Sequence, residues 1–154
     1  MTKQFEKVLA ANRGEIAIRV IRACRELGIR TVAVYSFEDR NSLFRTKAHE
    51  SYEIGKGKSP IDAYLDIEEI IRVAKTKGCD AIHPGYGFLS ENSNFARACE
   101  DAGITFIGPT HQMMDRLGDK ISSKLVADAV GVPCIPGVEA AIRSDDEAVE
   151  FARA

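Results

Sequence analysis

The fold is decided by the stretch KVLAANRGEIAIRVIRACRELGIRTVAVY, residues 7–35. It opens with a short, mostly apolar run that ends in a polar turn at 12–14, as expected of a buried strand. Apolar residues then recur at helical spacing through 15–27, and Gly28 follows as a residue that ends helices. The last six residues are rich in β-branched side chains, so the stretch predicts a strand, a helix and a second, parallel strand. The apolar stripe predicted for the helix consists of Ile16, Val20, Cys24 and Leu27.

The same alternation continues to about residue 108. A polar, turn-rich segment at 36–49 precedes a short predicted strand, and SPID at 59–62 has the N-cap, the proline and the acid that start a helix. Because strands and helices alternate, we predict an open, mostly parallel α/β sheet with helices on both faces, a Rossmann-like architecture. The further elements predicted are strands at 51–54, 80–83 and 104–107 and helices at 59–77 and 90–102.

After residue 109, helical segments follow one another without a strand between them. Cys134-Ile135 lies between two prolines and forms at most an edge strand. Helix caps and glycine stops mark where the helices begin and end. The features predicted are helices at 110–117 and 119–130, the cap Asp119, the stop Gly131 and a capping box at 144–147 that opens a last helix.

This change of pattern predicts two domains. Residues 1–109 are expected to form a complete α/β domain, and 110–154 to begin another one. The last predicted helix reaches Ala154 without a terminal glycine. We therefore expect the chain to be a piece of a longer protein.

The composition is that of a folded protein without a strong net field. The 154 residues are 45% hydrophobic and 29% charged, with a formal net charge of −2. These values argue against disorder and give no electrostatic reason to expect binding to nucleic acid or to a membrane. No stretch has the roughly 18 apolar residues of a membrane span, and the N-terminus lacks the apolar core of a signal peptide.

The cysteines are far apart and form no CxxC pair. Their mostly apolar surroundings predict buried, reduced thiols rather than disulfides or a zinc site. We therefore expect a cytoplasmic location and no bound metal. The four cysteines are Cys24, Cys79, Cys99 and Cys134.

The loop after the first strand raises a dinucleotide-binding alternative. Such domains place a glycine-rich loop there and, about 20 residues later, an acid that binds the ribose; here Glu38 and Asp39 follow the second strand. The fingerprint needs three glycines, whereas this loop has only Gly14, flanked by the bulky Arg13 and Glu15. A capped helix N-terminus is the favoured interpretation.

One side of the first helix carries Arg19, Arg22 and Glu26, opposite the apolar stripe. Two arginines and an acid suit a solvated face, which spacing alone favours. They also suit a two-fold contact between subunits, in which each arginine meets the partner's acid.

The segment HPGYGFLSEN at 83–92 lies between the end of a predicted strand and the start of a helix. Ligands of open α/β sheets gather at such ends, and two glycines would let a ligand approach the backbone. Tyr86 and Glu91 would supply polar groups. A tight turn that needs glycine, with His83 as a structural histidine, explains the same residues equally well.

Lys120 lies in the first turn of a predicted helix, where the helix dipole disfavours a cation. An anionic ligand would give a reason for it, whereas a solvated lysine is the simpler interpretation. No GxxxxGK[ST] segment occurs in the sequence, so an intact P-loop NTPase is excluded.

Four segments together resemble the N-terminal part of a biotin carboxylase, the ATP-grasp component of biotin-dependent carboxylases. Within that family, the segments at 35–40 and 57–67 look most like the pyruvate carboxylase branch. The resemblance implies ATP-dependent carboxylation of biotin by bicarbonate. The four segments are ANRGEIA at 11–17, AIHPGYGFLSEN at 81–92, FIGP at 106–109 and GDK at 118–120.

The resemblance also implies roles for single residues. It assigns Lys120 to ATP binding and the loop residues Tyr86, Gly87 and Glu91 to the biotin and bicarbonate side of the site. It assigns Arg19, Arg22 and Glu26 to a dimer interface, so that the two-fold interpretation of this face overtakes the solvated one. It places no catalytic residue and no metal ligand within the 154 residues, so we expect the chain to be inactive alone.

The cofactors and partners follow from the same resemblance. The implied cofactors are ATP, Mg²⁺ and a biotin carried on another domain, with bicarbonate as substrate. The implied partners are a second copy of the chain and the biotin carboxyl carrier and carboxyltransferase domains of a parent enzyme. Neither nucleic acid nor a membrane is expected as a partner.

Overall fold

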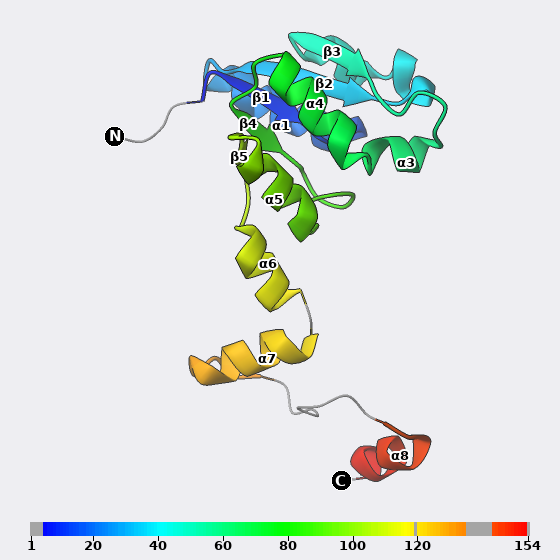
Figure 1. Cartoon of the computed structure of the whole chain (residues 1–154), viewed down its shortest axis with the longest axis vertical. Coiled ribbons are helices and arrows are strands. Elements are labelled where there is room, and N and C mark those ends of the chain that lie inside the picture. The colour runs from blue at the N-terminus through cyan, green and yellow to red at the C-terminus, as the bar shows by residue number, and fades with distance from the viewer. Residues whose placement is uncertain (1–4, 119, 135–142, 154) are drawn as a thin grey trace. The chain divides into compact units, whose positions relative to one another are not determined.

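The computed structural model describes residues 5–118, 120–134 and 143–153, without the side chains at positions 120, 147 and 151. The chain divides into two compact units, Met1–His111 and Gln112–Ala154. The first unit contains the sheet, and the second contains helices (Figure 1).

All five described strands belong to one sheet, in the order β3-β2-β1-β4-β5, and every neighbouring pair is parallel. In the centre, Leu9 pairs with Val32 on one side and with Ile82 on the other. The predicted open parallel α/β sheet is therefore confirmed. The strands are β1 (Lys7–Ala10), β2 (Arg30–Tyr35), β3 (Glu50–Glu53), β4 (Ala81–His83) and β5 (Thr105–Phe106).

Helices cover both faces of this sheet. Alternate residues of a strand point to opposite faces, so Leu9 joins a buried cluster with α4 and α5, whereas Ala10 joins one with α1 and α2. Burial on both faces explains why the central strands are almost continuously apolar. The helices of this unit are α1 (Gly14–Glu26), η1 (Phe37–Asn41), α2 (Leu43–Lys47), α3 (Pro60–Tyr64), α4 (Ile67–Thr76), α5 (Ser93–Asp101) and the start of α6 (His111–Leu117).

Helix α1 forms where the sequence predicts it, but its buried side differs from the prediction. Ala17, Ile21 and Cys24 face the sheet, whereas Leu27 follows the helix and is 69% exposed. The predicted stripe began one residue too early. Ala17 is fully buried in this face.

Three other predictions need correction. The segment 36–49, expected to be irregular, contains the short helices η1 and α2. The helix expected over 59–77 is two helices, because the Asp66 side chain accepts the Glu69 amide and caps a second start. The helix expected from residue 90 begins at Ser93, after Asn92 caps it by accepting the Phe95 amide.

The second unit contains most of α6, together with α7 (Lys120–Ala129) and α8 (Asp145–Arg153). These helices lie where the sequence predicts them, and Gly131 has the positive φ of a helix stop. The predicted cap Asp119 and most of the predicted edge strand at 134–135 lie outside the described residues.

Three of the four cysteines are buried and all four are free, as predicted for reduced thiols. Burial raises the pKa of Cys79 to about 11 and that of Cys99 to about 12, so both thiols are unreactive near neutral pH. The expectation of burial is wrong for Cys134, which is exposed.

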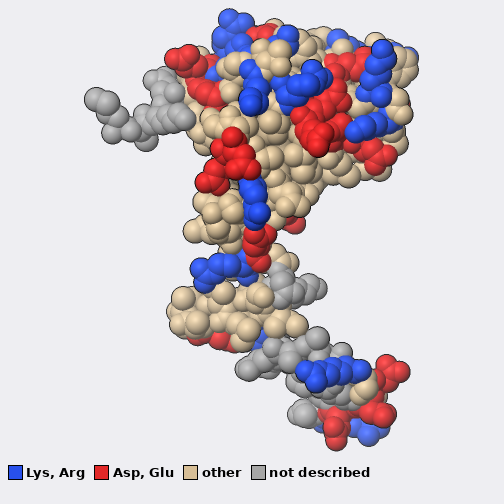
Figure 2. Space-filling view, in the orientation of Figure 1, with Lys and Arg blue, Asp and Glu red and all other residues tan. Residues whose placement is uncertain are grey.

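Lys and Arg side chains are interspersed with Asp and Glu on the face of the first unit seen in Figure 2.

Candidate functional site

The candidate site lies where the chain leaves the two central strands. β1 and β4 are neighbours, but the chain passes from β1 to α1 on one face and from β4 to α5 on the other. Such a switch point leaves a crevice outside the carboxyl ends of the strands, where ligands of open α/β sheets bind. The two segments singled out in the sequence, 12–14 and 83–92, both follow these strands.

Asn12 joins the two segments. It is fully buried, and its Nδ2 donates to the carbonyl oxygens of Pro84 at 2.7 Å and Tyr86 at 2.9 Å. Its Oδ1 accepts the amide of Arg13 at 2.9 Å. Both amide hydrogens and the side-chain oxygen are therefore used within the protein, and Asn12 fixes the loop rather than facing a ligand.

Gly85 allows this close approach of loop and helix. A Cβ at this position would lie 2.5 Å from Cγ2 of Ile16 and 2.7 Å from Nδ2 of Asn12. Its φ of +70° is also one that side chains rarely adopt. Space and backbone conformation both require glycine here.

Arg13 and Asp39 form a two-pronged ion pair beside this loop. Nε of Arg13 lies 2.7 Å from Oδ2 of Asp39, and Nη2 lies 2.8 Å from Oδ1. Ser42 and Tyr64 donate further hydrogen bonds to the same carboxylate, each at 2.8 Å. These donors, the guanidinium first, lower the pKa of Asp39 to about 2 although the side chain is buried.

This ion pair removes the support for dinucleotide binding. Asp39 was the buried candidate for holding a ribose, but both of its oxygens are occupied by donors from the protein. Arg13 stands where a dinucleotide-binding loop would have glycine. The buried Asp39 is therefore a structural group that joins the ends of β1 and β2.

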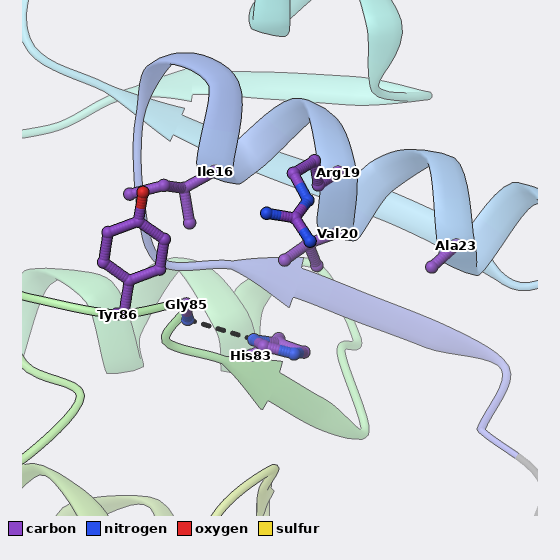
Figure 3. A pocket seen from close by; sticks show the side chains of 7 residues that line it. All are labelled: Ile16, Arg19, Val20, Ala23, His83, Gly85 and Tyr86. Atoms are coloured by element: carbon purple, nitrogen blue, oxygen red, sulfur yellow. Dashed lines mark hydrogen bonds between the residues drawn. The ribbon is translucent and has the colours of Figure 1, made fainter.

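A hollow of about 310 Å³ opens between α1 and the loop after β4 (Figure 3). Nδ1 of His83 accepts the Gly85 amide at 3.0 Å, so a neutral His83 carries its proton on Nε2. Burial lowers the pKa of His83 and favours this neutral form. The residues that line the hollow are Ile16, Arg19, Val20, Ala23, His83, Gly85 and Tyr86.

The structure brings two of the predicted site residues to this hollow, Tyr86 and Arg19. Tyr86 is 60% exposed, and its hydroxyl donates to Oε1 of Glu15 at 2.9 Å, which raises the pKa of Tyr86. Gly87 and Glu91 are exposed on the same loop and do not line the hollow. Of the three predicted loop residues, only Tyr86 therefore lines the hollow.

The predicted interface residues lie on the exposed side of α1. Nε of Arg22 donates to Oε1 of Glu26 at 2.9 Å, and both side chains are largely exposed. Arg19 turns toward the hollow above Val20 (Figure 3). The three residues therefore share one helix side, but Arg19 also belongs to the loop region.

Lys120 begins α7 in the second unit, and its side chain lies outside the described part of the chain. In the described ranges, no group of three or more His, Cys, Asp or Glu side chains could hold a metal ion. Nor does any helix in the described part of the chain have the length and hydrophobicity to cross a membrane.

Sequence reasoning missed Asn12 and Tyr64 as parts of this region and gave Asp39 a different role. A buried polar residue directly after an apolar strand was a usable signal for Asn12. No sequence signal pointed to Tyr64, because its partner Asp39 is 25 residues away.

The fold and the loop define the class of this domain. It is a Rossmann-like α/β domain with a glycine-containing loop at its switch point. The family described as "Biotin carboxylase, N-terminal domain" matches residues 4–114. The chain belongs to this family, as the resemblance had implied.

Individual relatives agree with this assignment. The chain is 57% identical over 149 residues to mitochondrial pyruvate carboxylase of Mus musculus, covering 97% of the chain and 13% of that protein. It is 53% identical to biotin carboxylase of Halalkalibacterium halodurans, covering 97% and 33%. The biotin carboxylase domain dimer of Hydrogenobacter thermophilus 2-oxoglutarate carboxylase, solved with MgADP and bicarbonate, superposes with a TM-score of 0.92 at 50% identity, covering 98% and 33%. The chain thus spans only an eighth to a third of the length of these relatives.

Proposed function

We propose that the chain is the N-terminal part of a biotin carboxylase, within a pyruvate carboxylase. The observation that carries this proposal is the 57% identity to a pyruvate carboxylase along 97% of the chain. The reaction would be ATP-dependent: a bicarbonate oxygen would attack the γ-phosphorus of ATP, with ADP as the leaving group, to give carboxyphosphate. Carboxyphosphate would break down to CO₂ and phosphate, and the ureido nitrogen of biotin would give up its proton to that phosphate as it takes up the CO₂. The carboxyl group would then pass to pyruvate and give oxaloacetate.

The loop after β4 would face the biotin and bicarbonate side of the site. Three features support this. Tyr86 presents an exposed ring whose hydroxyl is held by Glu15. Gly87 has a φ of +69° with open space around it, so a ligand can approach the backbone there. Glu91 adds an exposed carboxylate. These residues would bind and orient the substrate through non-covalent contacts, and none of them would form a covalent bond with it.

Lys120 would contribute to ATP binding as a cation beside the phosphates. Its place at the start of α7, in a family whose relative in Hydrogenobacter thermophilus binds MgADP, supports this role. The Mg²⁺ ligands and the catalytic groups would belong to parts of the enzyme outside these 154 residues. The chain alone is then expected to be inactive.

The exposed face of α1 would form a two-fold interface between biotin carboxylase domains. The Arg22–Glu26 ion pair supports this, because two copies could exchange it for reciprocal pairs across the axis. The related Hydrogenobacter thermophilus domain was solved as a dimer. Arg19 would lie at the edge of this interface, next to the hollow.

The domain organisation follows from the same proposal. Residues 1–109 would be the pre-ATP-grasp domain and 110–154 the start of the ATP-grasp domain. A biotin carboxyl carrier and a carboxyltransferase domain would complete the enzyme, in keeping with relatives about eight times as long as this chain. The buried free thiols support a reducing compartment such as the cytoplasm, although the pyruvate carboxylase of Mus musculus is mitochondrial.

A chimera tests the proposed activity. Residues 1–154 replace the matching third of the Halalkalibacterium halodurans biotin carboxylase, and bicarbonate-dependent ATP cleavage is measured with free biotin. The chimera is expected to turn over, and the 154-residue chain alone is not. A folded chimera that fails to respond to biotin would contradict the proposal, and so would turnover by the isolated chain.

Two alternatives have their own support. The 53% identity to a separate biotin carboxylase protein fits a subunit of an acyl-CoA carboxylase, for which pyruvate would not serve as acceptor. The exposed ion pair on α1 fits a non-catalytic dimerisation module. The acceptor specificity of the full-length enzyme distinguishes the first alternative, and activity of the chimera argues against the second.

A further inference from the structure

The loop that carries Tyr86 is held on both sides of that residue. On one side, Asn12 binds the carbonyl oxygens of Pro84 and Tyr86 itself. On the other side, the ring of Phe88 packs against the ring of Tyr64, with centroids 5.2 Å apart and an angle of 32° between planes. Tyr64, which belongs to the distant helix α3, thus contacts the loop two residues after Tyr86.

Phe88 has an unfavourable backbone conformation. Its φ is +46°, and among the described residues it is the only non-glycine with a positive φ. A bulky residue adopts this conformation only where its surroundings compensate. Phe88 is 36% exposed, so deep burial does not offset the cost of the positive φ. The contact with Tyr64 is the one ring contact that Phe88 makes among the described residues.

Tyr64 is itself held rigidly. It is 1% exposed, and its hydroxyl donates to Oδ2 of Asp39 at 2.8 Å and accepts the amide of Ser36 at 3.3 Å. Asp39 is in turn fixed by two hydrogen bonds from Arg13. The orientation of the Tyr64 ring is therefore set by a charged cluster at the ends of β1 and β2.

We propose that Asp39 and Tyr64 are positioning residues for Tyr86, acting through the ring of Phe88. Asp39 orients Tyr64, Tyr64 holds Phe88 in its left-handed conformation, and Phe88 fixes the half of the loop that Asn12 does not reach. The role for substrate rests on the proposed function of Tyr86. The mechanical part, that Tyr64 restrains the loop, does not.

Amide hydrogen exchange of the chain tests the mechanical part. Two amides report on the loop: Gly85, which donates to His83, and Ser90, which donates to the carbonyl of Gly87. In Tyr64→Leu the Ser90 amide is expected to exchange about ten-fold faster relative to the Leu9 amide in β1, because its half of the loop opens locally. The Gly85 amide lies in the half held by Asn12 and is expected to change less. Tyr64→Phe, which keeps the ring but loses the hydrogen bond to Asp39, is expected to recover only part of the protection.

Two further variants separate ring contact from other effects. Phe88→Asn removes the ring but suits a positive φ; faster exchange of the Ser90 amide supports the proposal, and unchanged or slower exchange overturns it. Tyr52→Phe removes a hydroxyl that donates to Glu50 in β3, and it is expected to leave the loop unchanged. Equal acceleration in the loop and in β1 would mean general destabilisation and would also overturn the proposal.

The chimera with the Halalkalibacterium halodurans enzyme tests the role for substrate. Tyr64→Leu is expected to raise the KM for free biotin several-fold with a smaller change in kcat, and Tyr64→Phe is expected to restore the KM in part. If exchange in the loop is faster but the KM is unchanged, Tyr64 restrains the loop and the proposed role of Tyr86 is refuted. If the KM rises while exchange in the loop is unchanged, the proposal that Tyr64 restrains the loop is refuted.

Discussion

The guanidinium of Arg13 binds the carboxylate of Asp39 through two hydrogen bonds, 2.7 Å and 2.8 Å long, across 26 residues of sequence. Arg13 is the N-cap residue of α1, and Asp39 lies in η1 after β2. The pair therefore ties together the ends of two neighbouring strands at the edge where the candidate site lies. Its geometry suits Arg rather than Lys, because a planar guanidinium presents two parallel N–H donors that match the two oxygens of one carboxylate.

Replacing this carboxylate should destabilise the domain. Asp39→Asn removes the charge of a residue that is 5% exposed and whose carboxylate receives hydrogen bonds from three residues. A loss of about 2 kcal/mol in the free energy of unfolding is expected, as for hydrogen bonds to buried charged groups. Urea denaturation measures it. Glu38→Gln, at the exposed neighbouring acid, is the matched control and should change stability little; equal effects would refute the assignment.

The same carboxylate should make stability depend on pH in acid. The pKa of Asp39 falls from an ordinary 3.8 to about 2 on folding, so the unfolded chain binds the proton more readily. Its contribution is present above about pH 4 and is lost as the pH falls toward about 2. Unfolding free energies measured over this range should converge for wild type and Asp39→Asn. Curves that stay parallel would show that Asp39 is not the group responsible.

Two glycines of the loop should respond differently to a methyl group. In Gly85→Ala the new Cβ would collide with Ile16 and Asn12 in addition to the strained φ, and a loss of about 3 kcal/mol is expected. Gly87→Ala meets no atom within 4 Å and should cost only about 1 kcal/mol for its positive φ. Thermal unfolding of both variants checks this order. A Gly87→Ala variant as unstable as Gly85→Ala would contradict the packing shown here.

The two-fold interface proposed on α1 should depend on charge. Arg22→Glu places two acids where the chain now has an ion pair, so sedimentation velocity should show dissociation of any dimer. The double reversal Arg22→Glu with Glu26→Arg should restore association. Arg40→Glu, an exposed charge on η1, is the control for net charge. A wild-type chain that stays monomeric at every concentration would remove the interface from this piece of the protein.

Local signals predicted the elements of the first unit well. The helix start at 59–62 was correct because Ser59 accepts the Asp62 amide and Pro60 occupies the first turn. The break at Asp66 was missed because the hydrophobic pattern continues through it. A second cap inside an apolar pattern is visible only when the cap hydrogen bond is seen.

The candidate site was predicted in part. Position at the end of a strand, together with glycine spacing, was sufficient to single out the loop with Tyr86. The hydrogen-bond partners of Asn12 and the pairing of Arg13 with Asp39 were not predictable, because nothing local shows which polar residue meets which across the sheet. The prediction of three interface residues on α1 stays a prediction, as does the role of Lys120.

The sequence by itself determined the alternation of strands and helices, the parallel sheet and the family, because these depend on short-range periodicity and on contiguous motifs. Only the tertiary structure decided the strand order and the switch point between β1 and β4. It also decided that the Asp39 carboxylate accepts hydrogen bonds from Arg13 and Tyr64 and is not free to bind a ribose. The physical reason is that a buried charge must be paired with hydrogen-bond donors, and the donors near Asp39 come from segments that only the assembled sheet brings together.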